Sequence, residues 1–219
     1  MRGKSTPHPI IFALAIALVI VGVAGGAVAS YLRSGHVDSL RSYAPADGRR
    51  VIVCLGDSLT AGDAAPPDQS YPAWLQRRLD GAGYRYRVVN AGISGDRVAD
   101  GLNRLQRDVL SQHPSVVIVE LGSNDPGRTP RSRWASDLAA IVSRLRAHGA
   151  WVILGGLDEP GMGDVYRAVA ARYQTPLVWF TADLWSRPGL WGDAHHPSGA
   201  GYRVVAESFW PAVHAAVKG

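Results

Sequence analysis

Cysteine is almost absent from this chain of 219 residues, since Cys54 is the only one. An intramolecular disulfide is therefore impossible, and a metal site built on several cysteines is excluded. The seven histidines show no metal-binding spacing beyond the adjacent His195 and His196, so we predict no metal and no cofactor. Cys54 lies inside an apolar run, which favours a small buried side chain over a reactive thiol.

Runs of one charge are missing as well. Arg2 and Lys4 account for two of the 23 basic residues, which leaves 21 basic and 18 acidic side chains beyond residue 30. No Lys/Arg run and no stripe of aromatic and basic residues occurs, so we predict no nucleic-acid binding. The segment 56–62 lacks both a Gly-x-Gly-x-x-Gly pattern and a P-loop lysine, so nucleotide binding has no support.

One long hydrophobic run is present, at the amino terminus. Ile10–Ala29 contains no charged residue and follows Arg2 and Lys4. A run of this length suffices to span a bilayer, and the positive charges before it favour a cytoplasmic amino terminus. A cleaved signal peptide is the alternative, because Ala27-Val28-Ala29 before Ser30 has the small-x-small form of a cleavage site. Both interpretations predict an extracytoplasmic domain, either anchored by one helix or secreted after cleavage near Ala29.

The rest of the chain predicts one α/β domain. We expect the anchor or signal peptide over 1–31, a linker over 32–49 and the folded domain over 50–219. β-Branched runs alternate with segments of helical apolar spacing, which is typical of a three-layer α/β/α sandwich with a five-stranded parallel sheet. The expected strands are 51–55, 86–90, 115–121, 151–157 and 177–180, and the expected helices lie at about 70–79, 98–110, 134–145, 165–173 and 198–217.

Gly56-Asp57-Ser58 ends the first expected strand. A glycine allows a sharp turn there, so Ser58 is expected at the carboxyl edge of the sheet, where open α/β folds place their sites. Taken alone, the tripeptide also fits an ordinary turn. The Gly-x-Ser-x-Gly elbow of α/β-hydrolases is absent around Ser58.

Asp193-Ala194-His195-His196-Pro197 contains the partners that a serine nucleophile needs. A serine hydroxyl requires a base, and the base requires a third group to orient it. Asp193 and His196 are three residues apart before the last expected helix, so they can face each other and leave Nε2 of His196 for Ser58. His195 is the alternative base, and capping of the helix entrance is the alternative role of Asp193.

Four blocks, each directly after an expected strand or before the last helix, together resemble the GDSL/SGNH hydrolase family. The resemblance covers residues 50–218 and is strongest with the branch of bacterial thioesterase I/lysophospholipase L1-like enzymes and arylesterases. It implies the flavodoxin-like SGNH fold. The blocks are Gly56-Asp57-Ser58-Leu59, Ile93-Ser94-Gly95-Asp96, Gly122-Ser123-Asn124-Asp125 and Asp193–Pro197.

The resemblance implies hydrolysis of carboxylic esters through an acyl-enzyme, with Ser58, His196 and Asp193 as the catalytic triad. It also implies an oxyanion hole formed by the backbone amides of Ser58 and Gly95 and by the side chain of Asn124.

Each loop of the oxyanion hole, taken singly, also fits an ordinary turn. Gly92 is the alternative glycine of the second block. Arg97 stands where close relatives often have threonine, which leaves the substrate preference open.

The substrate remains open at this point. We expect a monomer that acts on a small-molecule, lipid or carbohydrate ester or a thioester, and that contacts the membrane through Ile10–Ala29 if that segment is retained. The alternatives are an extracytoplasmic carbohydrate O-deacetylase or O-acyltransferase, and an anchored binding module without activity. Trp179, Trp185 and Trp191 either line a substrate cleft or pack in the core.

Overall fold

The computed structural model of the chain describes residues 47–184 and 186–219. The predicted anchor or signal peptide over 1–31, most of the linker, and Trp185 lie outside these described residues. Within them, no helix combines the length and the apolar composition that crossing a membrane requires.

Five parallel strands form one sheet, as the sequence predicts, and their order is β2-β1-β3-β4-β5. Almost every residue of the central strands β1 and β3 is buried, which explains their unbroken apolar runs. In register, Gly56 at the end of β1 pairs with Gly92 on one side and Glu120 on the other. Three strand ends therefore meet at one edge. The strands are β1 (Arg50–Gly56), β2 (Tyr86–Gly92), β3 (Val116–Glu120), β4 (Trp151–Gly156) and β5 (Leu177–Trp179).

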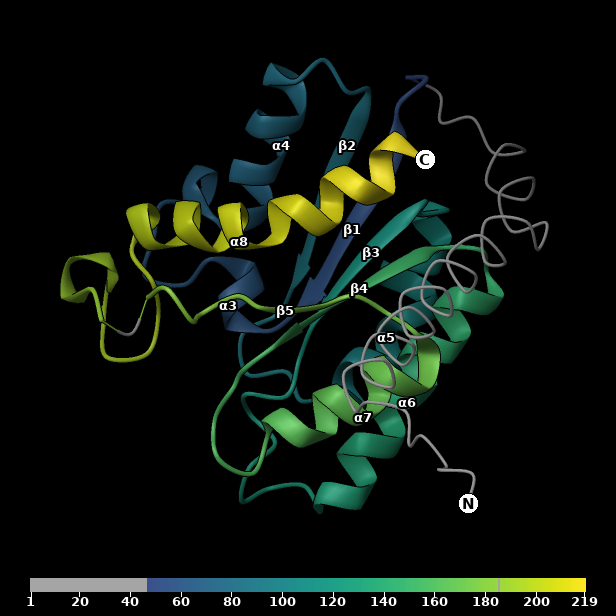
Figure 1. Ribbon diagram of the computed structural model, residues 1–219, viewed down its shortest axis with the longest axis vertical. Coiled ribbons are helices and arrows are strands. Elements are labelled where there is room, and N and C mark those ends of the chain that lie inside the picture. The colour runs from purple at the N-terminus through teal and green to yellow at the C-terminus, as the bar shows by residue number, and fades with distance from the viewer. Residues whose placement is uncertain (1–46, 185) are drawn as a thin grey trace, which may run out of the picture. The chain divides into compact units, whose positions relative to one another are not determined.

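Helices cover both faces of the sheet (Figure 1). Helices α4 (Tyr71–Gly81) and α8 (Gly199–Lys218) lie on one side. Helices α5 (Val98–Asp108), α6 (Arg131–Ala147) and α7 (Gly163–Tyr173) lie on the other side. Short 3₁₀ turns occur at η1 (Pro67–Gln69), η2 (Leu110–Gln112) and η3 (Pro188–Leu190).

Aromatic side chains hold the helices against the sheet. Between the sheet and α4/α8, Phe209 stacks on Tyr71 and Phe180 with ring centroids 5.2 Å and 5.5 Å apart. A Cβ atom at Gly155 of β4 would lie 2.7 Å from Phe209 Cζ, so only glycine permits this close approach of α8. On the opposite side, Trp134 and Tyr166 pack edge to face at 5.6 Å.

One short helix, α3 (Ser58–Ala61), was not predicted from the sequence. Four residues are too few to show helical periodicity, and α3 depends on its neighbours instead. A Cβ atom at Gly56 would lie 1.9 Å from Thr60 Oγ1, and one at Gly92 would lie 2.2 Å from the Ala61 nitrogen. Glycine at two adjacent strand ends therefore makes room for α3 at the edge of the sheet.

Candidate active site

Ser58 is the first residue of α3 and lies directly beyond the end of β1. Asp57 caps this helix, since its Oδ1 accepts a hydrogen bond of 3.0 Å from the Leu59 amide. Gly62 ends the helix in the left-handed region, with φ of 98°. The Ser58 amide has no hydrogen-bond partner within the described residues. A free amide and a hydroxyl are thus presented together at the sheet edge.

The His196 ring lies between Ser58 and Asp193. Its Nε2 is 3.1 Å from Ser58 Oγ, and its Nδ1 is 3.0 Å and 2.9 Å from the two carboxylate oxygens of Asp193. A carboxylate beside Nδ1 requires the proton to sit on Nδ1, because a carboxylate only accepts hydrogen bonds. The lone pair of Nε2 therefore faces the serine hydroxyl.

Asp193 is held as an anion by its own loop. Hydrogen bonds from the His195 amide and then from the His196 side chain lower the pKa of Asp193 to about 2. The carboxylate is consequently ionised at neutral pH.

The geometry supports neither of the two alternative roles in the segment 193–197, which are His195 as the base and Asp193 as the cap of the last helix. The ring of His195 packs edge-on against that of His196 with centroids 6.4 Å apart, and only its backbone amide binds Asp193. Helix α8 is capped by Ser198, whose hydroxyl accepts from the Gly201 amide at 3.3 Å. The hydrogen bond to Ser58 therefore comes from His196 and not from His195, and the cap of α8 is Ser198 and not Asp193.

The two glycines considered for the oxyanion hole differ in their backbone amides. The Gly92 amide already donates to Asn90 Oδ1 at 2.9 Å. The Gly95 amide has no partner within the described residues, and its φ of 85° requires glycine. Of the two glycines, only Gly95 therefore has a backbone amide that is free to donate to a ligand.

The Asn124 side chain lines the same pocket as Ser58. Its Nδ2 donates to the Asp96 carbonyl at 3.0 Å and to Asp57 Oδ2 at 3.3 Å. Donation to an oxyanion therefore requires that one of these hydrogen bonds, the longer one first, be shared or released.

Two buried carboxyl groups lie beneath the nucleophile, and their burial was not predicted from the sequence. Asp57 is fully buried and accepts a short hydrogen bond of 2.5 Å from Ser123 Oγ. Glu120 is buried at the end of β3 and accepts from Thr60 Oγ1 at 2.8 Å. Burial raises the pKa of both groups, and the neighbouring charge of Asp57 raises that of Glu120 further. An acidic residue that closes the apolar run Val116–Val119 was the available signal.

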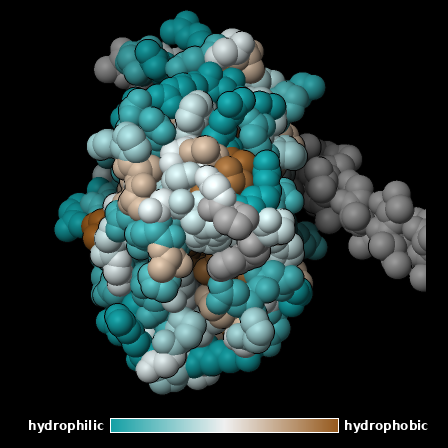
Figure 2. Space-filling view, turned by 90° about the vertical axis from the view of Figure 1, so that its left-hand side faces the viewer, coloured by the Kyte–Doolittle hydropathy of each residue, from teal (hydrophilic) through white to brown (hydrophobic). Residues whose placement is uncertain are grey.

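A pocket of about 440 Å³ opens beside Ser58. Apolar side chains from four different segments form much of its wall, together with the carboxylate of Glu159 and the imidazole of His195. Figure 2 shows this side of the molecule, where a few apolar residues are exposed near the centre among hydrophilic ones. The apolar lining residues include Pro126, Leu157, Met162 and Trp191.

The tryptophans and Arg97 take different positions. Trp191 lines the pocket and donates from Nε1 to the Leu184 carbonyl at 3.2 Å. Trp179 is instead partly buried and packs edge to face on the core residue Tyr166 at 6.2 Å. Arg97 pairs with Asp100 at 3.3 Å in the first turn of α5 and does not line the pocket.

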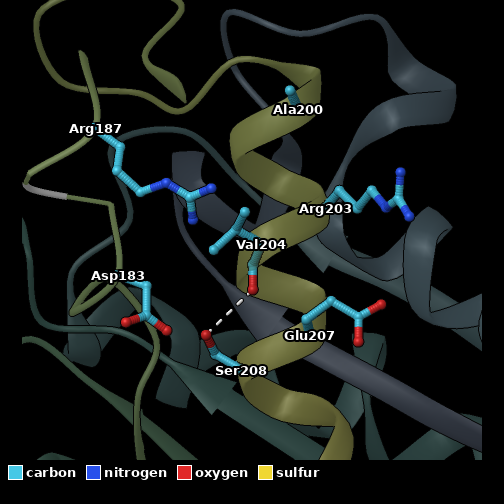
Figure 3. Close-up of a pocket in the computed structure, with 7 residues that line it drawn as sticks. All are labelled: Asp183, Arg187, Ala200, Arg203, Val204, Glu207 and Ser208. Atoms are coloured by element: carbon cyan, nitrogen blue, oxygen red, sulfur yellow. Dashed lines mark hydrogen bonds between the residues drawn. The ribbon is translucent and has the colours of Figure 1, made fainter. Parts of the chain in front are cut away.

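A second hollow, of about 470 Å³, lies between α8 and the segment after β5 (Figure 3). Asp183 and Arg187 line it from that segment, and Glu207 lines it from α8, where its carboxylate pairs with Arg78 at 2.8 Å. Ser208 binds the Val204 carbonyl rather than a base. No nucleophile paired with a base is present there. Across the described residues, no group of three or more potential ligands is arranged to hold a metal ion.

Comparison with known proteins gives a consistent family match. Residues 54–204 match the model of the GDSL-like lipase/acylhydrolase family. Esterase TesA of Pseudomonas aeruginosa is 37% identical over 74% of this chain and 87% of that protein. An arylesterase of Vibrio mimicus is 32% identical over 71% of this chain and 84% of its own length.

Two further matches extend the comparison. Thioesterase 1/protease 1/lysophospholipase L1 of Escherichia coli K12 is 28% identical over 71% of this chain and 79% of that protein. Among solved structures, a crystal structure of TesA superposes with a TM-score of 0.72 at 36% identity, covering 76% of this chain and 99% of that one.

Proposed function

Because this chain belongs to the GDSL-like lipase/acylhydrolase family and is a carboxylic ester hydrolase, we propose that it works through an acyl-enzyme formed on Ser58. His196 is the general base and acid, and Asp193 orients it. The amides of Ser58 and Gly95 and the side chain of Asn124 stabilise the oxyanion.

In acylation, Ser58 Oγ attacks the carbonyl carbon of the ester while its proton moves to Nε2 of His196. The electrons of the carbonyl double bond move to its oxygen, and the oxyanion donors stabilise the resulting negative charge by hydrogen bonds. Collapse of this intermediate breaks the bond to the leaving group, which takes the proton from His196. Asp193 stabilises the transient imidazolium.

Deacylation repeats the same steps with water. His196 takes a proton from the water, and the resulting nucleophile attacks the acyl-serine carbonyl. The second intermediate releases the carboxylic acid and returns the proton to Ser58, so the enzyme needs no further co-reactant.

One observation carries the proposal. Ser58 and His196 are 138 residues apart in the chain, yet their side chains meet at 3.1 Å, with Asp193 at 2.9 Å on the far side of the ring. A serine, a histidine and a carboxylate in this order are the requirement for an activated serine.

The finer description also belongs to the proposal. Curated relatives are named as esterase, arylesterase and thioesterase/lysophospholipase, so we propose esters or thioesters with an apolar acyl part as substrates. The domain over 50–219 works as a monomer, because one chain contributes every group of the site. It works outside the cytoplasm, after a linker over 32–49 and an anchor or signal peptide over 1–31.

Hydrolysis of p-nitrophenyl esters from acetyl to palmitoyl by the full-length protein tests the proposal. We expect activity with wild type and none above background with Ser58→Ala, while Ser132→Ala, on the outer surface of α6, serves as the matched control. The chain-length optimum separates a deacetylase from an enzyme for longer acyl groups. Retained activity in Ser58→Ala would refute the acyl-enzyme, and release of acylated alcohol when an acceptor alcohol is added would indicate a transferase.

A further inference from the structure

We propose that Arg104 is a positioning residue of the oxyanion hole. Its guanidinium joins the turn before Ser58 to the loop that carries Gly95, and thereby fixes the relative position of the two backbone amides. The inference rests on the proposed function, because it takes these amides as the donors to the developing negative charge.

Arg104 lies on α5 with only 6% of its surface exposed. It is the one basic residue among the buried side chains of the described part of the chain. A buried cation is costly unless acceptors surround it. Its three acceptors are Asp96 Oδ2 at 2.6 Å from Nε, the Gly56 carbonyl at 2.9 Å from Nη2, and Asp108 Oδ2 at 3.3 Å from Nη1.

Two of these acceptors belong to the loops of the candidate site. The Gly56 carbonyl lies at the end of β1, two residues before Ser58, and also accepts from the Ile93 amide at 3.1 Å. Asp96 follows Gly95, and its own carbonyl accepts from Asn124 Nδ2 at 3.0 Å. The guanidinium thus contacts two of the three segments that hold the oxyanion donors, and Asp96 links it to the third segment, which carries Asn124.

The other restraints on the Gly95 loop are hydrogen bonds: the Ile93 amide to Gly56, the Asp96 amide to the Ile93 carbonyl at 3.1 Å, and Asn124 to the Asp96 carbonyl. Gly95 is exposed, and no atom lies within 4 Å of the position that a Cβ atom would occupy there, so no side chain packs on that side of the loop. The exposed Ser94 hydroxyl binds the half-buried Asp63 carboxylate at 2.7 Å, where water competes for the same hydrogen bonds. The contact from Arg104 to Asp96 is the one ion pair among these restraints, and its two side chains are only 6% and 13% exposed.

The planar shape of the guanidinium decides which substitution is informative. Its nitrogens bind the Asp96 carboxylate and the Gly56 carbonyl in a fixed relative orientation. A lysine ammonium keeps the charge but cannot reach both acceptors in that orientation. Arg104→Lys should therefore preserve the buried ion pair and lose the alignment of the two loops.

The test compares Arg104→Lys with wild type in the full-length protein. We expect kcat per titrated active site to fall by about 10- to 100-fold, because small misplacements of catalytic groups and loss of one oxyanion donor have effects of this size. We expect KM for p-nitrophenyl butyrate to change by less than about 2-fold. Affinity for an alkylboronic acid, which adds to Ser58 as a tetrahedral anion, should fall in parallel with kcat/KM.

Active-site titration separates this role from a merely structural one, because misfolded molecules are not counted. Asp108→Asn is the matched control: it removes the guanidinium partner farthest from the site and should leave kcat per site within about 2-fold. Asp96→Asn weakens the same link while keeping the side-chain shape, so it should lower kcat per site by several-fold and carries the test if Arg104→Lys does not fold.

Two outcomes would overturn the inference: an unchanged kcat per site in both Arg104→Lys and Asp96→Asn, or an equal loss in Asp108→Asn. Failure of the proposed function looks different, because the wild-type protein would then be inactive or Ser58→Ala would retain activity.

Discussion

The nucleophile half of the candidate site rests on buried polar groups, whereas the acid–base half lies near the surface. Asp57, Glu120 and Arg104 are 0%, 1% and 6% exposed. The side chains of Asp193 and His196 are 50% and 21% exposed. The first half combines segments far apart in the chain, while Asp193 and His196 are only three residues apart and hold each other.

Because of this difference in burial, substitutions in the two halves should have different effects on stability and on rate. Hydrogen bonds among buried groups are strong because water does not compete, and removing one partner leaves the other unsatisfied. Changes in the nucleophile half should therefore affect both stability and rate. Changes in the acid–base half should affect the rate and leave the fold largely intact.

The largest decrease in kcat is expected when the general base of the acid–base half is removed. His196→Ala should lower kcat by about 10⁴–10⁶, because the serine loses its base. His195→Ala, in the adjacent position, should stay within about 3-fold of wild type, and both variants should unfold at nearly the wild-type temperature. Equal losses of kcat in the two variants would contradict the assignment of the base.

In the nucleophile half, Asn124→Ala should lower kcat by about 10²–10³, the effect of losing one oxyanion donor. Because Asn124 also binds Asp96 and Asp57, a lower unfolding temperature should accompany the loss. Asn103→Ala, on the exposed face of α5, is the control for both measurements. A near-normal kcat in Asn124→Ala would rule out the oxyanion role.

Glu120→Gln tests the nucleophile half through the pH dependence of the free energy of unfolding. Burial, and then the charge of Asp57, raise the folded pKa of Glu120 well above its ordinary value of 4.5. Above that ordinary pKa the unfolded chain binds fewer protons than the folded protein, so wild-type stability declines as pH rises. The glutamine variant lacks this contribution.

Urea denaturation at pH 4, 6 and 8 measures the effect of Glu120→Gln. The difference in unfolding free energy between the two proteins should shift in favour of the variant as pH rises. Glu207→Gln, an exposed residue paired with Arg78, should show no comparable trend. A difference independent of pH would mean that Glu120 does not hold its proton in the folded protein.

The smallest expected effect concerns the pocket that the two halves share. Glu159 lines this pocket, and its side chain has no hydrogen-bonding or ionic partner within the described residues. An unpaired carboxylate repels anionic substrates by about 1 kcal/mol at 4 Å in water. Glu159→Gln should therefore raise kcat/KM about 3- to 5-fold for a p-nitrophenyl ester with a terminal carboxylate.

The same variant should change kcat/KM by less than about 2-fold for the neutral ester of equal length. Asp183→Asn, in the second hollow, controls for the change in net charge. Equal gains on both esters would show that charge is not the cause.

Several features of the molecule were predictable because they depend on neighbours in the chain. The five strands follow from short β-branched runs, and the sheet of the structure confirms them. Asp193 and His196 lie three residues apart, a spacing at which two side chains meet in one loop. Gly56 before Ser58 indicated a turn at the end of a strand.

Other features were not predictable from local pattern. Arg104 appears in the sequence as one of several charged residues of α5, and only packing shows that it is buried. Glu120 comes to lie beneath α3 because β3 pairs with β1. The pocket lining comes from segments between Ser58 and His196 whose proximity depends on the order of the strands.

Local sequence patterns thus predicted the α/β architecture, the serine at a strand end and the histidine–aspartate pair. These features depend on periodicity and on short spacing in the chain. Packing between distant segments decided which carboxyl groups are buried beneath Ser58 and which acceptors surround Arg104. Those properties arise when parallel strands bring distant loops to one edge of the sheet and exclude water from between them.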